Sequence, residues 1–182
     1  VITARMVKKD HPNARICFIG PCAAKKLEAN RKSVRSDVDY VLTFEELQGM
    51  FDSKDIDFNT LEADPEDGLN EGTAMGRGFA VGGGVAAAVV EAIKHIDPSR
   101  EVQIEYGDGL RECKKMLMMA KAGKRNGYLL EGMACPGGCV AGAGTITPVR
   151  ESTMNVEKFK KEAAEVSCTA SPFVDRLKDV EE

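Results

Sequence analysis

Short apolar runs and longer amphipathic segments alternate along the chain. The apolar runs cover residues 14–20, 39–43, 101–106 and 127–135. Runs of this length with little polar alternation are typical of buried strands. Helical periodicity occupies the segments around them, at residues 1–10, 23–32, 44–52, 78–96, 109–124 and 155–166. The alternation predicts an α/β fold with a mostly parallel sheet flanked by helices.

Specific residues mark some boundaries of these elements. Thr43 followed by Glu46 forms a capping box at the start of the helix 44–52. Residues 52–75 contain many turn formers without a period, which predicts a long loop. The first helix begins at residue 1 with no capping residue before it, so we expect a fragment of a longer chain. No linker or repeat interrupts the remainder, and residues 1–182 are predicted to form a single α/β lobe.

Composition excludes several classes of function. With 182 residues, 43% hydrophobic and 30% charged, the chain has the make-up of an ordinary globular protein. Its net charge of -4 provides no basic surface for nucleic acid. The longest strongly apolar stretch, residues 85–90, is too short to span a membrane. Six cysteines at irregular spacings favour metal or redox chemistry in a reducing compartment, which predicts a cytoplasmic location.

Three of the cysteines follow predicted strands. Cys22 lies after the first strand, and Cys135 and Cys139 lie after the last. If these strands share one sheet, the three thiols meet at its carboxyl edge, where α/β folds form their sites. Iron–sulfur clusters bind cysteine thiolates, and four glycines would let the backbone approach the sulfides: Gly137, Gly138, Gly142 and Gly144. Backbone N–H groups in this loop would also donate to sulfide or thiolate. Each cysteine alone would be read as a buried, unreactive thiol, but together they predict metal ligation.

Other positions carry weaker signals. Lys25 is either a solvated helix lysine or a donor to an anionic ligand beside Cys22. The glycines of residues 76–84 lack the dinucleotide-binding spacing, because Val81 stands where a glycine would be needed, and they favour tight helix packing. Three further cysteines are assigned no role in a site: Cys17, Cys113 and Cys168.

Three segments resemble a known family. PCAAKKLE at residues 21–28 and EGMACPGGCVAGAG at residues 131–144 resemble signature motifs of the [FeFe]-hydrogenase catalytic domain, which binds the H-cluster. GFAVGGGVAAAV at residues 78–89 resembles the glycine-rich segment of that family, and the three segments occur in the family's order. The resemblance implies that the parent protein catalyses 2H⁺ + 2e⁻ = H₂. It also implies that this lobe is one of two, with the cofactor at the seam.

The resemblance implies a role for each matching cysteine. Cys22 and Cys135 would be ligands of the [4Fe–4S] part of the H-cluster. Cys139 would bridge that part to a di-iron subcluster carrying CO, CN⁻ and a dithiolate. The family's first motif, which contains adjacent cysteines, is absent from the sequence. We therefore expect the isolated piece to be inactive and to lack the H-cluster.

The resemblance also implies contacts around the di-iron unit and a set of partners. Lys25 would donate to a cyanide, while Met133 and Phe79 would line the pocket. The implied partners are H₂, protons, the missing upstream part of the same chain, a ferredoxin-like electron carrier and the hydrogenase maturases. The sequence departs from the family's usual residues at three positions, Gly20, Gly132 and Ala143. These departures favour a sensory hydrogenase over a fast hydrogen-evolving enzyme.

Two other functions account for part of the same pattern. A Narf-like iron–sulfur protein would keep a [4Fe–4S] cluster without hydrogenase activity, but it would give Lys25 and Met133 no task. A bare redox or zinc-binding module would use the three cysteines alone. That module leaves the order of the three resembling segments unexplained.

Overall fold

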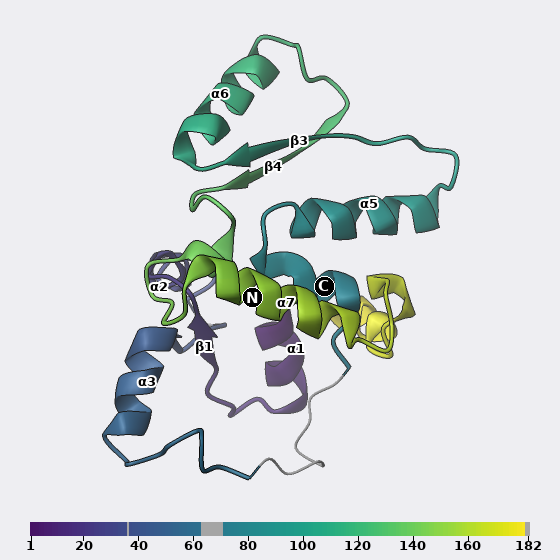
Figure 1. The fold of residues 1–182 in the computed structure, drawn as a ribbon. Helices are drawn as coiled ribbons and strands as arrows, with labels where there is room; N and C mark the ends of the chain where they lie inside the picture. The colour runs from purple at the N-terminus through teal and green to yellow at the C-terminus, as the bar shows by residue number, and fades with distance from the viewer. Residues whose placement is uncertain (36, 63–70, 181–182) are drawn as a thin grey trace. The chain divides into compact units, whose positions relative to one another are not determined.

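The computed structural model describes residues 1–35, 37–62 and 71–180 (Figure 1). Its contacts divide the chain into two compact units. The first unit comprises the described residues of Val1–Gly68, Ala143–Ile146 and Phe173–Glu182. The second comprises those of Leu69–Gly142 and Thr147–Pro172. The two units are described separately below.

The first unit contains one parallel strand pair and its helices. Its elements are α1 (Ile2–Asp10), β1 (Cys17–Gly20), α2 (Ala24–Ala29), β2 (Tyr40–Thr43), α3 (Phe44–Asp52) and the 3-10 helix η5 (Val174–Val180). The strands β1 and β2 pair in parallel, with Cys17 opposite Tyr40 and Gly20 opposite Thr43. The predicted capping box is confirmed: Thr43 N–H donates to Glu46 Oε2 at 2.9 Å, and Glu46 N–H donates to Thr43 Oγ1 at 3.1 Å.

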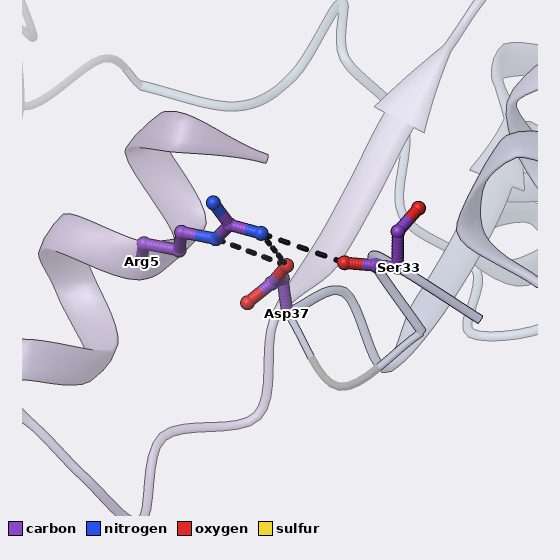
Figure 2. A network of polar contacts seen from close by, with 3 residues as sticks. All are labelled: Arg5, Ser33 and Asp37. Atoms are coloured by element: carbon purple, nitrogen blue, oxygen red, sulfur yellow. Dashed lines mark hydrogen bonds and ion pairs between the residues drawn. The ribbon is translucent and has the colours of Figure 1, made fainter. Parts of the chain in front are cut away.

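Two carboxylates fix the segment that leads into β2. Asp37 Oδ2 accepts from Arg5 Nε at 3.2 Å and from Arg5 Nη2 at 3.1 Å, and Nη2 also lies 3.5 Å from the Ser33 carbonyl (Figure 2). Asp39 accepts from the Ile16 amide at 2.8 Å. These contacts attach α1 and the start of β1 to the chain just before β2.

The second unit contains a second parallel strand pair. Its elements are α4 (Ala74–Arg77), η2 (Gly78–Ala80), α5 (Gly84–Ile96), β3 (Gln103–Asp108), α6 (Leu110–Lys121), β4 (Tyr128–Met133), η3 (Cys139–Ala141), α7 (Val149–Lys161) and η4 (Cys168–Ala170). The strands β3 and β4 pair in parallel from Gln103 opposite Tyr128 to Asp108 opposite Met133. Both α5 and α6 pack on this pair (Figure 1).

Helices α5 and α6 cover opposite faces of β4. Successive strand residues point to opposite faces. The side chain of Glu131 reaches the amides at the start of α5, whereas a Cβ on Gly132 would lie 3.1 Å from Cys113 Sγ of α6. Gly132 therefore gives α6 room to approach the strand closely. This local packing accounts for one of the three departures from the family's usual residues.

The predicted elements agree with the structure in type but differ in several bounds. The α/β class with parallel strands is confirmed, and helix 44–52 has the bounds of α3. Among the described residues the four strands form two separate pairs, so the one-sheet premise for the three thiols is wrong. The last predicted helix begins at Val149 and ends at Lys161, where residues 155–166 were expected. Residues 63–70 of the predicted loop lie outside the described residues.

Candidate functional site

The loop after β4 carries two of the predicted ligands. Cys135 and Cys139 are both half-buried thiols in the second unit. Gly138 N–H donates to the Cys135 carbonyl at 3.0 Å, and Gly142 N–H donates to the Cys139 carbonyl at 2.9 Å. The loop therefore folds as two consecutive tight turns with one cysteine at the start of each.

The glycine-rich segment before α5 lies directly against this loop. Gly82 N–H donates to the Gly137 carbonyl at 3.1 Å. A Cβ on Gly138, whose φ is +97°, would lie 2.5 Å from Gly82 N and 2.8 Å from the Ala80 carbonyl oxygen. Backbone thus packs on backbone with no space for a side chain. The predicted role of these glycines in close packing beside the cysteine motif agrees with this geometry.

The end of β3 holds the loop from the other side. Asp108 Oδ1 accepts the Gly137 amide at 2.7 Å, and Gly109 N–H donates to the Met133 carbonyl at 2.8 Å. The amides of Gly137 and Gly138 donate to oxygens of the protein, those of Asp108 and of Cys135. That backbone N–H groups of this loop donate to a bound sulfide or thiolate stays a prediction.

Glu131 supplies the cap that the sequence of α5 lacks. The N-cap residue Gly83 has no side chain, and Glu131 accepts the Gly83 amide at 3.0 Å and the Ala86 amide at 2.9 Å. The Glu131 side chain is buried, and its charge faces the positive end of the helix dipole. A carboxylate therefore occupies the place where a dinucleotide fold would bind phosphate. The rejection of a dinucleotide site agrees with this arrangement.

A cavity of about 580 Å³ adjoins the loop within the second unit. Met133 and Gly137 line it, as does Gly82. Its polar lining comes from Tyr106, Asp108, Glu131, Thr153, Glu157 and Lys160. Met133 thus presents a soft, polarisable side chain toward a space beside the two cysteines.

Phe79 belongs to the same unit. It lies in η2, and this short helix contacts η3, which begins at Cys139. Its side chain is 46% exposed. The second unit therefore brings four predicted site residues into one neighbourhood: Phe79, Met133, Cys135 and Cys139.

Cys22 and Lys25 belong to the first unit. Cys22 is half-buried just after β1, and Lys25 lies in α2. Lys25 Nζ donates to Glu28 Oε2 at 2.6 Å, and this bond lowers the pKa of the Glu28 carboxyl. The cyanide contact expected of Lys25 would require the ammonium to leave Glu28 or to be shared with it. Within residues 1–35, 37–62 and 71–180, no three His, Cys, Asp or Glu side chains form a group that could hold a metal ion.

The remaining departures from the family's usual residues lie in the first unit. A Cβ on Gly20 would collide with the Phe18 ring, which covers this end of β1. Gly144 is buried, and its N–H donates to the Pro21 carbonyl at 2.7 Å, whereas Ala143 is exposed. An alanine is therefore tolerated at position 143 because its methyl group faces solvent.

Sequence reasoning missed two residues at the site, Asp108 and Glu131. Each was read only as part of a strand or motif. An acidic residue two positions beyond an apolar run, as Asp108 is after residues 101–106, was one available signal. A single acid within the run YLLEGM, which is Glu131, was the other.

The fold and the cysteine loop define an α/β protein with a paired-cysteine motif after a parallel strand. The sequence profile described as "Iron only hydrogenase large subunit, C-terminal domain" matches residues 1–143. The chain belongs to this family. It is 31% identical over 172 residues to the periplasmic [Fe] hydrogenase large subunit of Nitratidesulfovibrio vulgaris, covering 78% of this chain and 41% of that protein.

A cluster assembly factor and a second hydrogenase have sequence identities close to that of the first relative. A probable cytosolic Fe-S cluster assembly factor of Drosophila virilis is 30% identical over 199 residues, covering 83% of this chain and 41% of that protein. Iron hydrogenase 1 of Clostridium pasteurianum is 27% identical over 186 residues, covering 83% of this chain and 32% of that protein. The chain thus spans well under half the length of these curated relatives.

Solved structures share the fold. An [FeFe]-hydrogenase studied for oxygen inactivation of its H-cluster aligns with a TM-score of 0.70 at 19% identity, covering 99% of this chain and 62% of that chain. A hydrogenase from Chlamydomonas reinhardtii aligns with a TM-score of 0.67 at 18% identity, covering 99% of this chain and 63% of that chain. Within the part of the chain that the structure describes, no helix is long and apolar enough to cross a membrane.

Proposed function

We propose that the chain is part of the H-cluster-binding domain of an [FeFe]-hydrogenase whose parent protein interconverts protons and H₂. The observation that carries this proposal is the CPGGC loop, with Met133 lining a cavity beside it and η2 contacting its second turn. This combination supplies two thiolates and a soft wall in one place. The activity, partners and maturation of the whole protein are proposed with it.

The donor set fits an iron–sulfur cofactor. Cys135 and Cys139 offer two thiolates from one loop whose backbone is already satisfied by internal hydrogen bonds, so metal binding would not leave its amides unpaired. Cys22 is proposed as a further ligand of the [4Fe–4S] part. When bound, the cofactor supplies the metal centre and the electron transfer for the interconversion of protons and H₂.

The protein's own side chains have simpler tasks in this proposal. Met133 and Phe79 exclude water from the metal pocket, since both are large and lack a strong hydrogen-bonding group. Lys25 donates a hydrogen bond to an anionic ligand of the cofactor, and its ammonium gives up the bond to Glu28 to do so. Because the Glu28 carboxylate holds this ammonium at 2.6 Å in the structure, E28Q is expected to strengthen the contact between Lys25 and the cofactor.

A second candidate function is a Narf-like iron–sulfur protein that keeps a [4Fe–4S] cluster and has no di-iron unit. The Drosophila virilis relative supports it, because that protein is described as a probable cytosolic Fe-S cluster assembly factor. The cavity beside Met133 favours the hydrogenase, since a cubane alone gives this space no occupant. We further propose that the parent protein is a sensory hydrogenase. It would exchange electrons with a ferredoxin-like carrier and lie in the cytoplasm. The Nitratidesulfovibrio relative is named as periplasmic, and fractionation of the native host tests the location.

The deciding experiment is an infrared spectrum of the full-length protein after maturation with the di-iron cofactor. We expect bands in the CO and CN⁻ stretching regions that are lost in C139A and retained in C168A. Cys168 is the matched control because it is an exposed cysteine of η4 to which no role is assigned. An electron paramagnetic resonance signal of a [4Fe–4S] cluster without such bands would overturn the hydrogenase proposal and leave the second candidate.

A further inference from the structure

Both backbone polar groups of Gly137 are hydrogen-bonded to other segments of the second unit. Its N–H donates to Asp108 Oδ1 at 2.7 Å, and its C=O accepts from Gly82 N–H at 3.1 Å. One partner ends β3, and the other belongs to the turn before α5. Two segments that are distant in sequence therefore hold Gly137, the residue midway between Cys135 and Cys139.

The Asp108 contact is the only one of the two that comes from a side chain. A carboxylate acceptor makes a charge-assisted bond, which is stronger than a bond between neutral groups. The next residue reinforces it, because Gly109 N–H donates to the Met133 carbonyl at 2.8 Å and a Cβ on Gly109 would lie 3.3 Å from Pro136 Cγ. Asp108 and Gly109 therefore make two hydrogen bonds on either side of Cys135, one to Gly137 and one to Met133.

We propose that Asp108 is a positioning residue that sets the geometry of the CPGGC loop by holding the Gly137 amide. The bond gives this N–H an acceptor within the protein. It also places one fixed negative charge beside the loop. The consequence for a cluster rests on the proposed function, whereas the hydrogen bond itself does not depend on any metal.

The test compares D108A, D108N and E112A in the full-length protein without a cluster. Asparagine keeps an oxygen acceptor and removes the charge. E112A is the charge-matched control, since Glu112 lies on α6 of the same unit and its nearest cation, Lys115, is 3.8 Å away. Hydrogen exchange of the Gly137 amide is read by fragmentation mass spectrometry, and the alkylation rates of Cys135 and Cys139 are read against that of Cys168.

We expect D108A to speed exchange of the Gly137 amide by about tenfold or more, since bonds to charged acceptors are among the stronger ones. D108N should recover much of the protection, and E112A should match the wild type. Alkylation of Cys135 and Cys139 should rise in D108A while that of Cys168 does not change. Exchange in D108A within twofold of the wild type would overturn the proposal. So would a D108N protein that exchanges as fast as D108A. If D108A fails to fold, D108N is compared with E112A: faster exchange of the Gly137 amide in D108N supports the proposal, and equal exchange would overturn it.

These outcomes separate the inference from the proposed function. If infrared bands are absent but D108A exposes the Gly137 amide, the positioning role stands for any cluster that the loop holds. If the bands are present and exchange of the Gly137 amide is unchanged in D108A, the hydrogenase proposal is supported and the positioning role of Asp108 is refuted.

Discussion

The carboxylate of Glu131 accepts the amide of Ala86 at 2.9 Å, although 45 residues separate the two in sequence. It also accepts the Gly83 amide at 3.0 Å. The N-terminus of α5 is thereby capped by a neighbouring strand instead of by its own preceding residue. The same contact ties the glycine-rich turn to the strand that leads into the cysteine loop.

Replacing Glu131 by alanine should destabilise the protein by roughly 2–3 kcal/mol. The change leaves two amides without their acceptor and removes a buried charge from the positive end of a helix. Urea unfolding measures the effect. E101A, at an exposed position of the same unit, should change stability by less than about 0.5 kcal/mol. Equal losses of unfolding free energy in E131A and E101A would show that the Glu131 cap makes no specific contribution to stability.

Replacing Gly144 or Gly49 of the first unit by alanine should change the stability of the protein in opposite directions. A Cβ on Gly144 would lie 2.6 Å from Thr43 Cβ and 3.1 Å from the Pro21 carbonyl oxygen, so G144A should cost about 1–3 kcal/mol through overpacking. Gly49 lies inside α3 with nothing within 4 Å of its Cβ position, so G49A should stabilise by roughly 0.5–1 kcal/mol. Thermal melts of the two variants are the measurement, and shifts of the same sign would contradict the packing argument.

The space beside Gly20 is filled by Phe18. A Cβ at position 20 would collide with the tip of this ring, and a ring tip can move away at modest cost. We expect G20M to lower stability in the wild type and to be better tolerated in F18A. The coupling energy from the double-mutant cycle should be about 1 kcal/mol. A coupling indistinguishable from zero would mean that the ring and the new side chain do not compete for this space.

Asp39 should contribute to stability above pH 4 and lose that contribution in acid. The Ile16 amide, followed by Lys8 and Arg15, holds the pKa of Asp39 well below its ordinary value. A carboxyl with a depressed folded pKa stabilises the protein above its unfolded pKa of about 3.9. That contribution is lost as the pH falls through the folded pKa.

The variant D39N should therefore be less stable than the wild type at pH 7, and the difference should shrink below about pH 4. Urea unfolding across this pH range provides the measurement. D55N, at an exposed position of the same unit, serves as the isosteric control. A constant difference between D39N and the wild type at every pH would argue against a role for the ionised carboxyl.

Local chemistry explains which elements could be predicted from the sequence. The capping box of Thr43 and Glu46 acts over three residues, so its pattern is visible in the chain itself. The last helix was expected over residues 155–166 from its amphipathic pattern. It begins at Val149, directly after Pro148, whose φ of -56° suits the entry to a helix.

The candidate site divides in the same way. Cys135 and Cys139 could be found because ligands of one loop lie close in sequence. The sequence marks Asp108 and Glu131 only as acids at the edge of or within an apolar run. It does not show their partners, which are backbone amides 29 and 45–48 residues away that any residue type could provide. The division of the four strands into two pairs also depends on contacts between distant segments, which periodicity does not encode.

A loop attached at its midpoint behaves as two short arms. Gly137 is the fixed pivot, with Cys135 on an arm stiffened by Pro136 and Cys139 on an arm that begins at Gly138. Because Gly138 N–H also donates to the Cys135 carbonyl, the two arms are joined beside the pivot, and a shift of the Cys135 backbone reaches the start of the Cys139 arm directly.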